Sequence, residues 1–550
     1  MTRIFSGHII DIVNRRIIDG ELTIKDNKVY SISEKEGVSA NAPYIMAGFI
    51  DSHIHIESSM LLPRNFATQI VKFGTIGVVS DPHEIANVLG MQGIEYMIQD
   101  GKNVNFHFYN GTPSCVPATS FETSGAILNS EDVDILLGNE DIYFLSEMMN
   151  YPGVLFKDKE VMQKISSAIK HKKPIDGHAP SVVGEDIKEY SSYGITTDHE
   201  CSEIKEALEK INCGMKILIR EGSAAKNFDN LLSLVSSHPK DIMFCSDDKH
   251  PDDLLLGHIN LLVKRALLTG YDLFDVLRAT SLNPKEHYNL DFGLLQEGDN
   301  ADFIIVDNLQ DFDVLSTYIN GVEVYNRQTG VSKELVLNEL DTKVLPNKFN
   351  ATYLSEEDIK VKSEQTKINV IECFDGELFT KSVQCETKTE NNYVISDTSK
   401  DILKIVVLNR YENTKPQVAF IKGFGFKQGA IASSVSHDSH NIVAVGVSDK
   451  EIVEAINLVV ENKGGISLVC NEEKDVLPLQ IAGLMSKENC EIVAEKYKEL
   501  NSKAKNLSNS LQSPYMTLSF MALLVIPELK LSDKGLFDSK NFKFTELFVK

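Results

Sequence analysis

The chain has 550 residues, of which 55 are basic and 79 acidic, so its formal net charge at pH 7 is -24. A surface this acidic repels phosphate backbones and anionic lipid, which excludes nucleic acid and the membrane as expected partners. The hydrophobic share of 42% and the charged share of 24% are typical of a soluble globular protein, and the length predicts about three domains.

The eight cysteines are scattered along the chain, and none of them forms a C-x-x-C pair. Neither a thiolate zinc site nor a disulfide framework is therefore indicated, and the expected location is the reducing cytoplasm. The N-terminal stretch MTRIFSGHIIDIVNRR has no uninterrupted apolar segment, and the late stretch SFMALLVIPEL is too short to cross a bilayer. We expect neither an export signal nor a membrane span.

The pattern of apolar residues changes early in the chain. Residues 8–33 alternate apolar and polar side chains between turn signals such as DG and DN, which predicts hairpins. From residue 44 onward, short apolar runs are separated by amphipathic segments of helical length. Eight such runs follow one another: YIMAGFI, TIGVVS, VNFHFYN, DIYFLSE, KPIDGH, ITTDH, MKILIR and DIMFCSD. This repetition predicts an α/β fold, a TIM-like (β/α)₈ barrel of about 250 residues.

The expected domain boundaries follow from these patterns. The barrel occupies residues 44–285. Residues 1–43 and 286–345, which contain alternating runs such as ADFIIVD and VEVYN, are expected to form one small β-sheet domain from both flanks of the barrel. Residues 350–550, which open with the polar stretch LSEEDIKVKSEQTK, are expected to form a C-terminal α/β domain.

Ionisable residues collect where the apolar runs end, and the active sites of such barrels lie at the C-terminal ends of the strands. In chain order these residues are His53, His55, Asp81, His83, Glu84, Glu147, His178, His199 and Asp247. Each one alone has an ordinary explanation, because a single loop histidine is more often hydrogen-bonded than a ligand and Asp247 lies in the turn-like SDDKHP. Gathered at one barrel mouth, they predict a metal site.

The candidate ligands among them are four histidines and two carboxylates: His53, His55, His178, His199, Glu147 and Asp247. Six nitrogen and oxygen ligands exceed what one tetrahedral ion requires, so a pair of divalent cations bridged by a carboxylate is expected. Glu147 is the candidate bridge. Imidazole and carboxylate ligands without thiolate suit manganese, iron or zinc. Water held between two cations can lose its proton near pH 7. The expected reaction class is therefore metal-assisted hydrolysis.

The motifs GFIDSHIHIESSM, DPHEIANVLG, SEMMNYPGV, GHAP, TTDHE and CSDD resemble those of the bacterial adenine deaminases, a family of the amidohydrolase superfamily. The resemblance covers nearly the whole chain. QEGDNADFIIVD at 296–307 is similar to the superfamily's returning β-segment, and SSVSHDSHNIVAVG at 433–446 is similar to the adenine deaminase C-terminal domain. It implies conversion of adenine and water to hypoxanthine and ammonia at a two-metal centre, in purine salvage and adenine catabolism.

The resemblance also implies roles for particular residues. His53, His55 and Asp247 match the ligands of one metal, His178 and His199 match those of the other, and Glu147 matches the bridging carboxylate. In the implied mechanism, a bridging hydroxide attacks C6 of the purine while N1 is protonated. Asp247 would move the hydroxide proton to the departing amine, and Glu84 or His83 would supply or orient the proton at N1. Manganese is our first candidate for the metal, and a homodimer is expected from the general prevalence of dimers.

The sequence leaves room for functions besides adenine deamination. A cyclic-amide hydrolase of the dihydropyrimidinase type would commonly bridge its metals through a carbamylated lysine, but this chain has Glu147 there and no lysine in DIYFLSE. A zinc nucleoside deaminase would need P-C-x-x-C, which is absent. A noncatalytic metal-binding barrel remains an alternative, because fold does not fix function. The stretch with His437, Asp438 and His440 could close over the active site, bind a further ion or form a polar turn.

Overall fold

The computed structural model describes residues 2–338, 345–508 and 511–549. The chain divides into two compact units. Unit 1 comprises Met1–Pro82, Glu95–Ser114 and Asn129–Asp341, and unit 2 comprises His83–Ile94, Cys115–Leu128 and Thr342–Lys550. Two short segments from inside the expected barrel sequence therefore group with the C-terminal residues. Within the described ranges, no helix is both long and apolar enough to cross a membrane.

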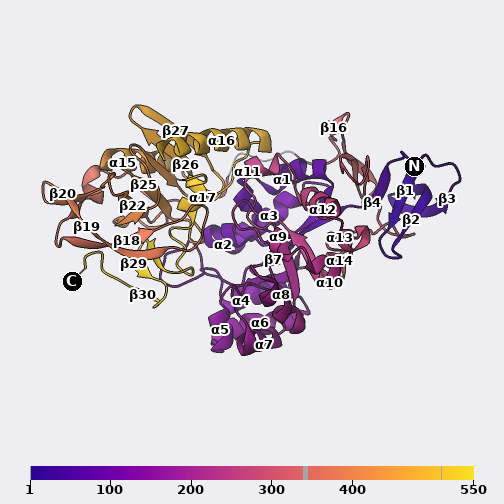
Figure 1. The fold of residues 1–550 in the computed structure, drawn as a ribbon, viewed down its shortest axis with the longest axis horizontal. Coiled ribbons are helices and arrows are strands. Elements are labelled where there is room, and N and C mark those ends of the chain that lie inside the picture. The colour runs from indigo at the N-terminus through magenta and orange to yellow at the C-terminus, as the bar shows by residue number, and fades with distance from the viewer. Residues whose placement is uncertain (1, 339–344, 509–510, 550) are drawn as a thin grey trace. The chain divides into compact units, whose positions relative to one another are not determined.

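Eight parallel strands form the centre of unit 1, one for each predicted apolar run. They are β5 (Phe49–Ile54), β6 (Thr75–Ser80), β7 (His107–Thr112), β8 (Ile142–Met148), β9 (Ile175–Gly177), β10 (Thr197–Asp198), β11 (Lys216–Arg220) and β12 (Ile242–Cys245). Figure 1 labels one of them, β7. The first five and the last three form two sheets. Parallel bridges between Ile175 and Ile195 and between Ile54 and Asp247 join the two sheets at both edges, so the strands close into a barrel.

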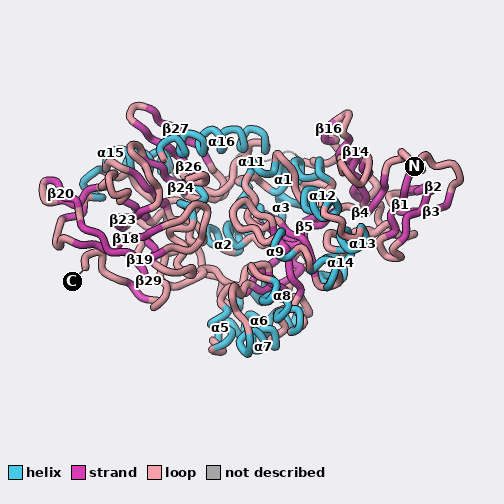
Figure 2. Tube along the Cα trace, viewed as in Figure 1, coloured by secondary structure: helices cyan, strands magenta, loops and turns pink. Residues whose placement is uncertain are grey.

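Helices of unit 1 alternate with these strands, as the tube in Figure 2 shows. They are α1 (Pro63–Ile70), α4 (Ser130–Leu137), α5 (Tyr151–Leu155), α6 (Lys159–His171), α7 (Gly184–Ser192), α8 (Ile204–Asn212), α9 (Phe228–Leu231), α10 (Leu234–Ser237), α11 (Pro251–Leu254), α12 (Ile259–Leu268), α13 (Leu273–Arg278) and α14 (Leu282–Tyr288), with 3₁₀ turns at Ile56–Ser59 and Val71–Phe73. Helix α3 (Met91–Gly101) spans a boundary between the units. In α6, the Asp158 side chain caps the first turn, and Val161, Ile165 and Ala168 are buried at helical spacing.

The first apolar run, predicted as one strand, is two strands that belong to different sheets. Tyr44–Ala47 forms β4 in a small sheet, and β5 begins at Phe49 in the barrel. Gly48 lies between them, where an added Cβ would sit 2.4 Å from Cγ2 of Ile76. Only a residue without a side chain lets the backbone pass so close to the second barrel strand.

The small sheet of unit 1 has the order β16-β15-β14-β13-β4-β1-β2-β3. Besides β4, its strands are β1 (Thr2–Asp11), β2 (Arg16–Lys25), β3 (Lys28–Glu34), β13 (Phe303–Val306), β14 (Val314–Ile319), β15 (Val322–Asn326) and β16 (Gly330–Val331). Strand β4 pairs with β1 on one side and with β13 on the other, so segments from both flanks of the barrel belong to one sheet. Ile9, Leu22 and Phe303 are fully buried in its core.

The expected division into three domains stays a prediction, because the division into two compact units does not test its boundaries. Residues 339–344 of the expected range 286–345 lie outside the described part, as do residue 1 and, within 350–550, residues 509–510 and 550.

Unit 2 is built around an eight-stranded sheet of order β19-β18-β23-β22-β25-β24-β26-β27. These strands are β18 (Lys367–Glu372), β19 (Lys381–Glu386), β22 (Leu403–Leu408), β23 (Gln417–Lys422), β24 (Ala430–Ser433), β25 (Ile442–Gly446), β26 (Gly465–Cys470) and β27 (Glu473–Pro478). Helix α15 (Asp449–Glu461) packs Ile452, Ile456 and Val459 on this sheet. The other elements are α2 (His83–Leu89), a 3₁₀ turn at Glu356–Ile359, β17 (Val361–Lys362), β20 (Lys388–Glu390), β21 (Tyr393–Ile395), α16 (Cys490–Leu507), α17 (Pro514–Ser519), β28 (Leu529–Ser532), β29 (Gly535–Asp538) and β30 (Lys543–Phe544).

Candidate metal centre

All six expected metal ligands lie in unit 1, at the C-terminal ends of barrel strands. His53 is in β5 and Glu147 in β8, while His55, His178, His199 and Asp247 follow β5, β9, β10 and β12. Five of these side chains are buried, and His178 is half-buried. His53 and His55 share one face of the chain because they are two residues apart in an extended segment.

One group of ligand atoms gathers around Asp247. Its Oδ1 lies 3.3 Å from Nε2 of His55 and 3.7 Å from Nε2 of His53. The other ring nitrogen of His55, Nδ1, lies 3.0 Å from the Asp81 carbonyl oxygen, to which it donates a hydrogen bond. That bond occupies Nδ1 and leaves Nε2, which faces Asp247, as the nitrogen available to a cation. The backbone N–H of Asp247 donates to the carbonyl of His53 at 2.9 Å, which locks the two strand ends together.

A second group of ligand atoms gathers around Glu147. Its Oε2 lies 2.7 Å from Nδ1 of His178 and 3.2 Å from Nε2 of His199, while its Oε1 lies 3.6 Å from Nε2 of His55. The ligand atoms of His53, Glu147 and His199 all lie within 4.8 Å of one another, as do those of His53, His55 and Asp247. The two oxygens of Glu147 thus face different imidazole groups.

His53 tests whether this donor set fits a cation. Within the described residues, neither of its ring nitrogens has a hydrogen-bond partner, although the side chain is buried. Burial, followed by the charges of His199 and His55, holds the pKa of His53 well below its usual value, so the ring is neutral. A neutral imidazole is the form that binds metals, and a buried polar group without partners is otherwise costly. The residues therefore fit a divalent metal centre.

The carboxylates of the site are ionised despite their burial. Burial acts to raise the pKa of Glu147, but the neighbouring His178 and His199 outweigh it and hold the pKa well below the usual value. Burial likewise opposes ionisation of Asp247, but Arg220 and then His55 keep its pKa well below the usual value. The pKa of His178 is raised to about 9, because Glu200 and Glu147 overcome the lowering by burial. Such a site favours positive charge, which bound cations would supply in place of imidazole protons.

Two further residues of this site were not assigned from the sequence. Arg220, the last residue of β11, places Nη1 2.6 Å from Oδ2 of Asp247 and Nη2 3.0 Å from Oε2 of Glu200. Glu200 in turn lies 3.4 Å from Nε2 of His199. Both positions carried the same signal as the assigned residues, since Arg220 ends the run MKILIR and Glu200 ends the TTDHE motif. Together they tie the end of the seventh strand to the loops after the sixth and eighth.

His83 and Glu84 begin helix α2 and belong to unit 2. Nε2 of His83 lies 3.6 Å from Oε1 of Glu84, and the Glu84 carboxylate contacts the imidazoles of His437 and His440. The ligand atoms of His83, Glu84 and Asp438 also lie within 4.8 Å of one another. The SSVSHDSHN stretch thus meets the D-P-H-E motif inside unit 2. No short-range spacing could reveal this, because Glu84 and His437 are 353 positions apart.

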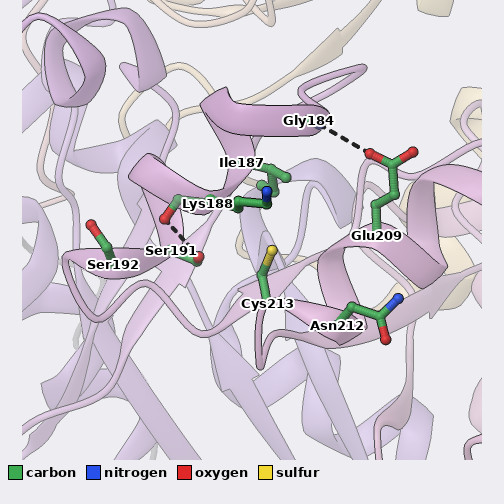
Figure 3. A pocket seen from close by; sticks show the side chains of 8 residues that line it. All are labelled: Gly184, Ile187, Lys188, Ser191, Ser192, Glu209, Asn212 and Cys213. Carbon is green, nitrogen blue, oxygen red and sulfur yellow. Dashed lines mark hydrogen bonds between the residues drawn. The ribbon is translucent and has the colours of Figure 1, made fainter.

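A pocket of about 640 Å³ lies elsewhere on unit 1, between α7 and α8 (Figure 3). The backbone N–H of Gly184 donates to Oε2 of Glu209 across it at 3.0 Å, and Lys188 and Cys213 line its wall. None of the expected metal ligands contributes to this pocket. It is therefore separate from the chemistry gathered at the strand ends.

The closed barrel and its imidazole–carboxylate cluster define a metal-dependent hydrolase of the amidohydrolase type. Residues 44–324 match the amidohydrolase family, which confirms the predicted fold class. Residues 377–543 match the adenine deaminase C-terminal domain. The adenine deaminase of Methanosarcina mazei is 50% identical over 558 residues, covering 99% of each chain, and that of Parabacteroides distasonis is 50% identical over 551 residues, covering 100% of this chain and 99% of the relative. The chain belongs to the adenine deaminase family.

Among solved structures, the β-aspartyl dipeptidase of Fervidobacterium islandicum AW-1 matches with 14% identity and a TM-score of 0.46, over 62% of this chain and 99% of that one. The guanine deaminase of E. coli matches with 17% identity and a TM-score of 0.39, over 60% of this chain and 99% of that one.

Proposed function

We propose that this protein hydrolyses adenine to hypoxanthine and ammonia in the cytoplasm, as a step of purine salvage. The observation that carries the proposal is the position of Glu147, whose two oxygens face separate imidazole groups at one barrel mouth, in a chain of the adenine deaminase family. A cyclic-amide hydrolase is disfavoured, because a glutamate stands where such enzymes commonly have a carbamylated lysine.

The metal ligands of the proposal are the six strand-end residues. His53, His55 and Asp247 would hold one divalent cation, His178 and His199 a second, and Glu147 would contact both. Manganese is the first candidate, with iron or zinc as alternatives. When bound, such cations supply Lewis acidity and lower the pKa of water.

Asp247 is the proposed proton carrier. Its Oδ2 is held by Arg220 at 2.6 Å, while its Oδ1 faces the imidazoles of His53 and His55. Oδ1 is thus the oxygen directed toward the reacting centre. An ionised carboxylate fixed in this way can accept a proton from the attacking water and return it to the departing amine.

Glu84 and His83 are the proposed groups at N1 of the purine. The barrel strand β6 ends at Ser80, so chain connectivity alone keeps the Cα atom of Glu84 within about 14 Å of the end of this strand. A carboxylate and an imidazole next to each other can supply or orient a proton at a ring nitrogen. In this proposal, protonation of N1 lets the ring accept electrons as C6 is attacked.

The decisive experiment measures ammonia release from adenine by protein that has been stripped with a chelator and reloaded with manganese, iron or zinc. We expect metal-dependent formation of hypoxanthine with two ions bound per chain. No ammonia release from adenine despite two bound ions would overturn the proposal. Dihydropyrimidines assayed in parallel would then identify a cyclic-amide hydrolase, and inactivity on both substrate classes would leave a noncatalytic metal-binding barrel.

We also propose a homodimer and a division into three domains, with 1–43 and 286–345 as the small sheet domain, 44–285 as the barrel and 350–550 as the C-terminal domain. Sedimentation equilibrium tests the first proposal. Limited proteolysis tests the second, since cleavage concentrated near residue 350 would support that boundary.

A further inference from the structure

The carboxylate of Glu84 is enclosed by two imidazoles of unit 2. Nδ1 of His437 contacts Oε1, and Nε2 of His440 contacts Oε2. The three side chains are buried, with exposed fractions of 2% for Glu84, 6% for His437 and 1% for His440. Both histidines lie in the loop of the β24–β25 hairpin, whose antiparallel register pairs Ser433 with Val443. We call this arrangement of Glu84, His437 and His440 the carboxylate clamp.

The tautomer of His440 follows from its surroundings. The backbone N–H of Ser436 donates to Nδ1 of His440 at 3.2 Å, so this nitrogen carries the lone pair. Burial is the main reason that the pKa of His440 is lowered to about 4, so the ring is neutral at pH 7. The single ring proton of His440 must then be on Nε2, where it is donated to Glu84.

His437 is held in place from two directions. Its backbone N–H donates to the carbonyl of Ser519 at 3.0 Å, and its ring stacks on Phe520 with centroids 5.2 Å apart and an interplanar angle of 24°. These contacts fix Nδ1 opposite Oε1 of Glu84. Because the ring cannot turn away without losing the stacking contact, the donor is in place before any substrate binds.

The protonation state of Glu84 depends on all the ionisable groups around it. Burial acts to raise its pKa, but His437, His440 and His83, in that order, outweigh burial and hold the pKa well below the usual value. Asp438 is the other nearby carboxylate. An ionised carboxylate can only accept hydrogen bonds, so each oxygen of Glu84 accepts from one imidazole nitrogen. The clamp explains these contacts without a cation.

We propose that His437 and His440 are positioning residues for adenine deamination, holding both oxygens of Glu84 so that its carboxylate is fixed in orientation when the purine binds. This inference rests on the proposed function. It assigns the C-terminal part of the chain a role in orienting Glu84. An ionised Glu84 must accept a proton before it can deliver one to the purine. The water consumed in the reaction supplies two protons, one for N1 through Glu84 and one for the departing amine through Asp247.

Matched amide substitutions test the clamp. The side-chain nitrogen of asparagine falls near the place of Nδ1 and that of glutamine near the place of Nε2, so His437→Asn and His440→Gln retain the donors. The exchanged pair, His437→Gln and His440→Asn, has the same chemistry but moves each donor away from its oxygen. We expect the exchanged variants to lose about 100-fold in kcat, with KM and the number of bound metals little changed, and the matched variants to lose much less.

The pH profile gives a second readout. Loss of an imidazole donor removes a group that lowers the pKa of Glu84, so this pKa should rise in the exchanged variants. The acid limb of kcat/KM should therefore move to higher pH in these variants and stay near the wild-type position in the matched ones. Equal kcat and equal pH profiles for the two pairs, with metal fully bound, would overturn the proposal.

A measurement without turnover separates the clamp from the proposed function. In protein labelled with ¹⁵N-histidine, the clamp requires a proton on Nδ1 of His437 and, on His440, on Nε2 but not Nδ1, each signal being assigned by its disappearance in the matching variant. Absence of either proton would overturn the clamp even if adenine is deaminated. Both protons present in a wild-type protein that does not deaminate adenine would instead overturn the proposed function, and with it the role of the clamp in that reaction.

Discussion

Arg220 offers the sharpest test of how the candidate metal centre is held together. This residue is 9% exposed, and its guanidinium pairs with the buried carboxylate of Asp247 at 2.6 Å and the half-buried one of Glu200 at 3.0 Å. The change Arg220→Met keeps most of the side-chain volume but removes the guanidinium from both carboxylates. Removal of one partner from a buried ion pair costs about 3–5 kcal/mol, and we expect a loss of this size in the free energy of unfolding at pH 7.

The assay is urea unfolding of metal-stripped protein, so that differences in metal affinity do not contribute. Arg220→Lys is the control, because it keeps the charge and loses the two-pronged geometry; we expect it to lie between the wild type and Arg220→Met. With metal restored, both variants should also lose kcat, since Oδ2 of Asp247 is no longer fixed. A wild-type urea midpoint for Arg220→Met would refute the reasoning, because the ion pair would then contribute nothing to stability.

Four further outcomes are expected. Asp247→Asn should retain the circular dichroism spectrum of the wild type while kcat falls by about 10²–10⁴-fold, and retained activity would exclude the proton-carrier role. Glu147→Gln should bind fewer than two metal ions per chain by elemental analysis, whereas unchanged stoichiometry would exclude it as the bridge. Gly48→Ala should lower the free energy of unfolding by about 1–3 kcal/mol, because its Cβ meets Ile76 at 2.4 Å; Ile76→Ala in the same chain should recover part of the loss, and no recovery would argue against that contact. Burial lowers the pKa of Lys530 to about 7, so the unfolded state binds one more proton than the folded state between about pH 7 and 10. The stability contributed by this residue therefore rises with pH over that window, and Lys530→Met should remove the slope when unfolding free energies are measured from pH 7 to 10.

Local patterns were enough to predict the barrel and most of the candidate metal centre. Each of the eight apolar runs holds a barrel strand, because hydrophobic periodicity and strand burial are properties of short segments. The ends of these runs also predicted the positions of the six expected metal ligands, because barrel topology brings the C-terminal ends of the strands together. Arg220 and Glu200 occupied equivalent positions, but their role depends on a contact between two strand ends that spacing alone does not specify.

Other features depend on distant partners, and sequence patterns do not show these. The break at Gly48 follows from the approach of Ile76, and the two strands that it separates look like one apolar run. Residues 83–94 and 115–128 lie between predicted barrel strands in the sequence, yet they group with the C-terminal unit. The pairing of Glu84 with His437 joins the segment 83–94 to the C-terminal part of the sequence, so it becomes visible only in three dimensions.

The position of β4 also constrains how the protein is made. Met46 of β4 pairs with Ile304 of β13, so one edge of the N-terminal hairpins has no partner until the ribosome has added the whole barrel sequence. At the usual rates of synthesis that interval is roughly 10–50 s. During this time β4 exposes unpaired backbone groups and its buried Ile45 to other nascent chains. We therefore expect the insoluble fraction of newly made protein to grow when ribosomes are crowded on the message.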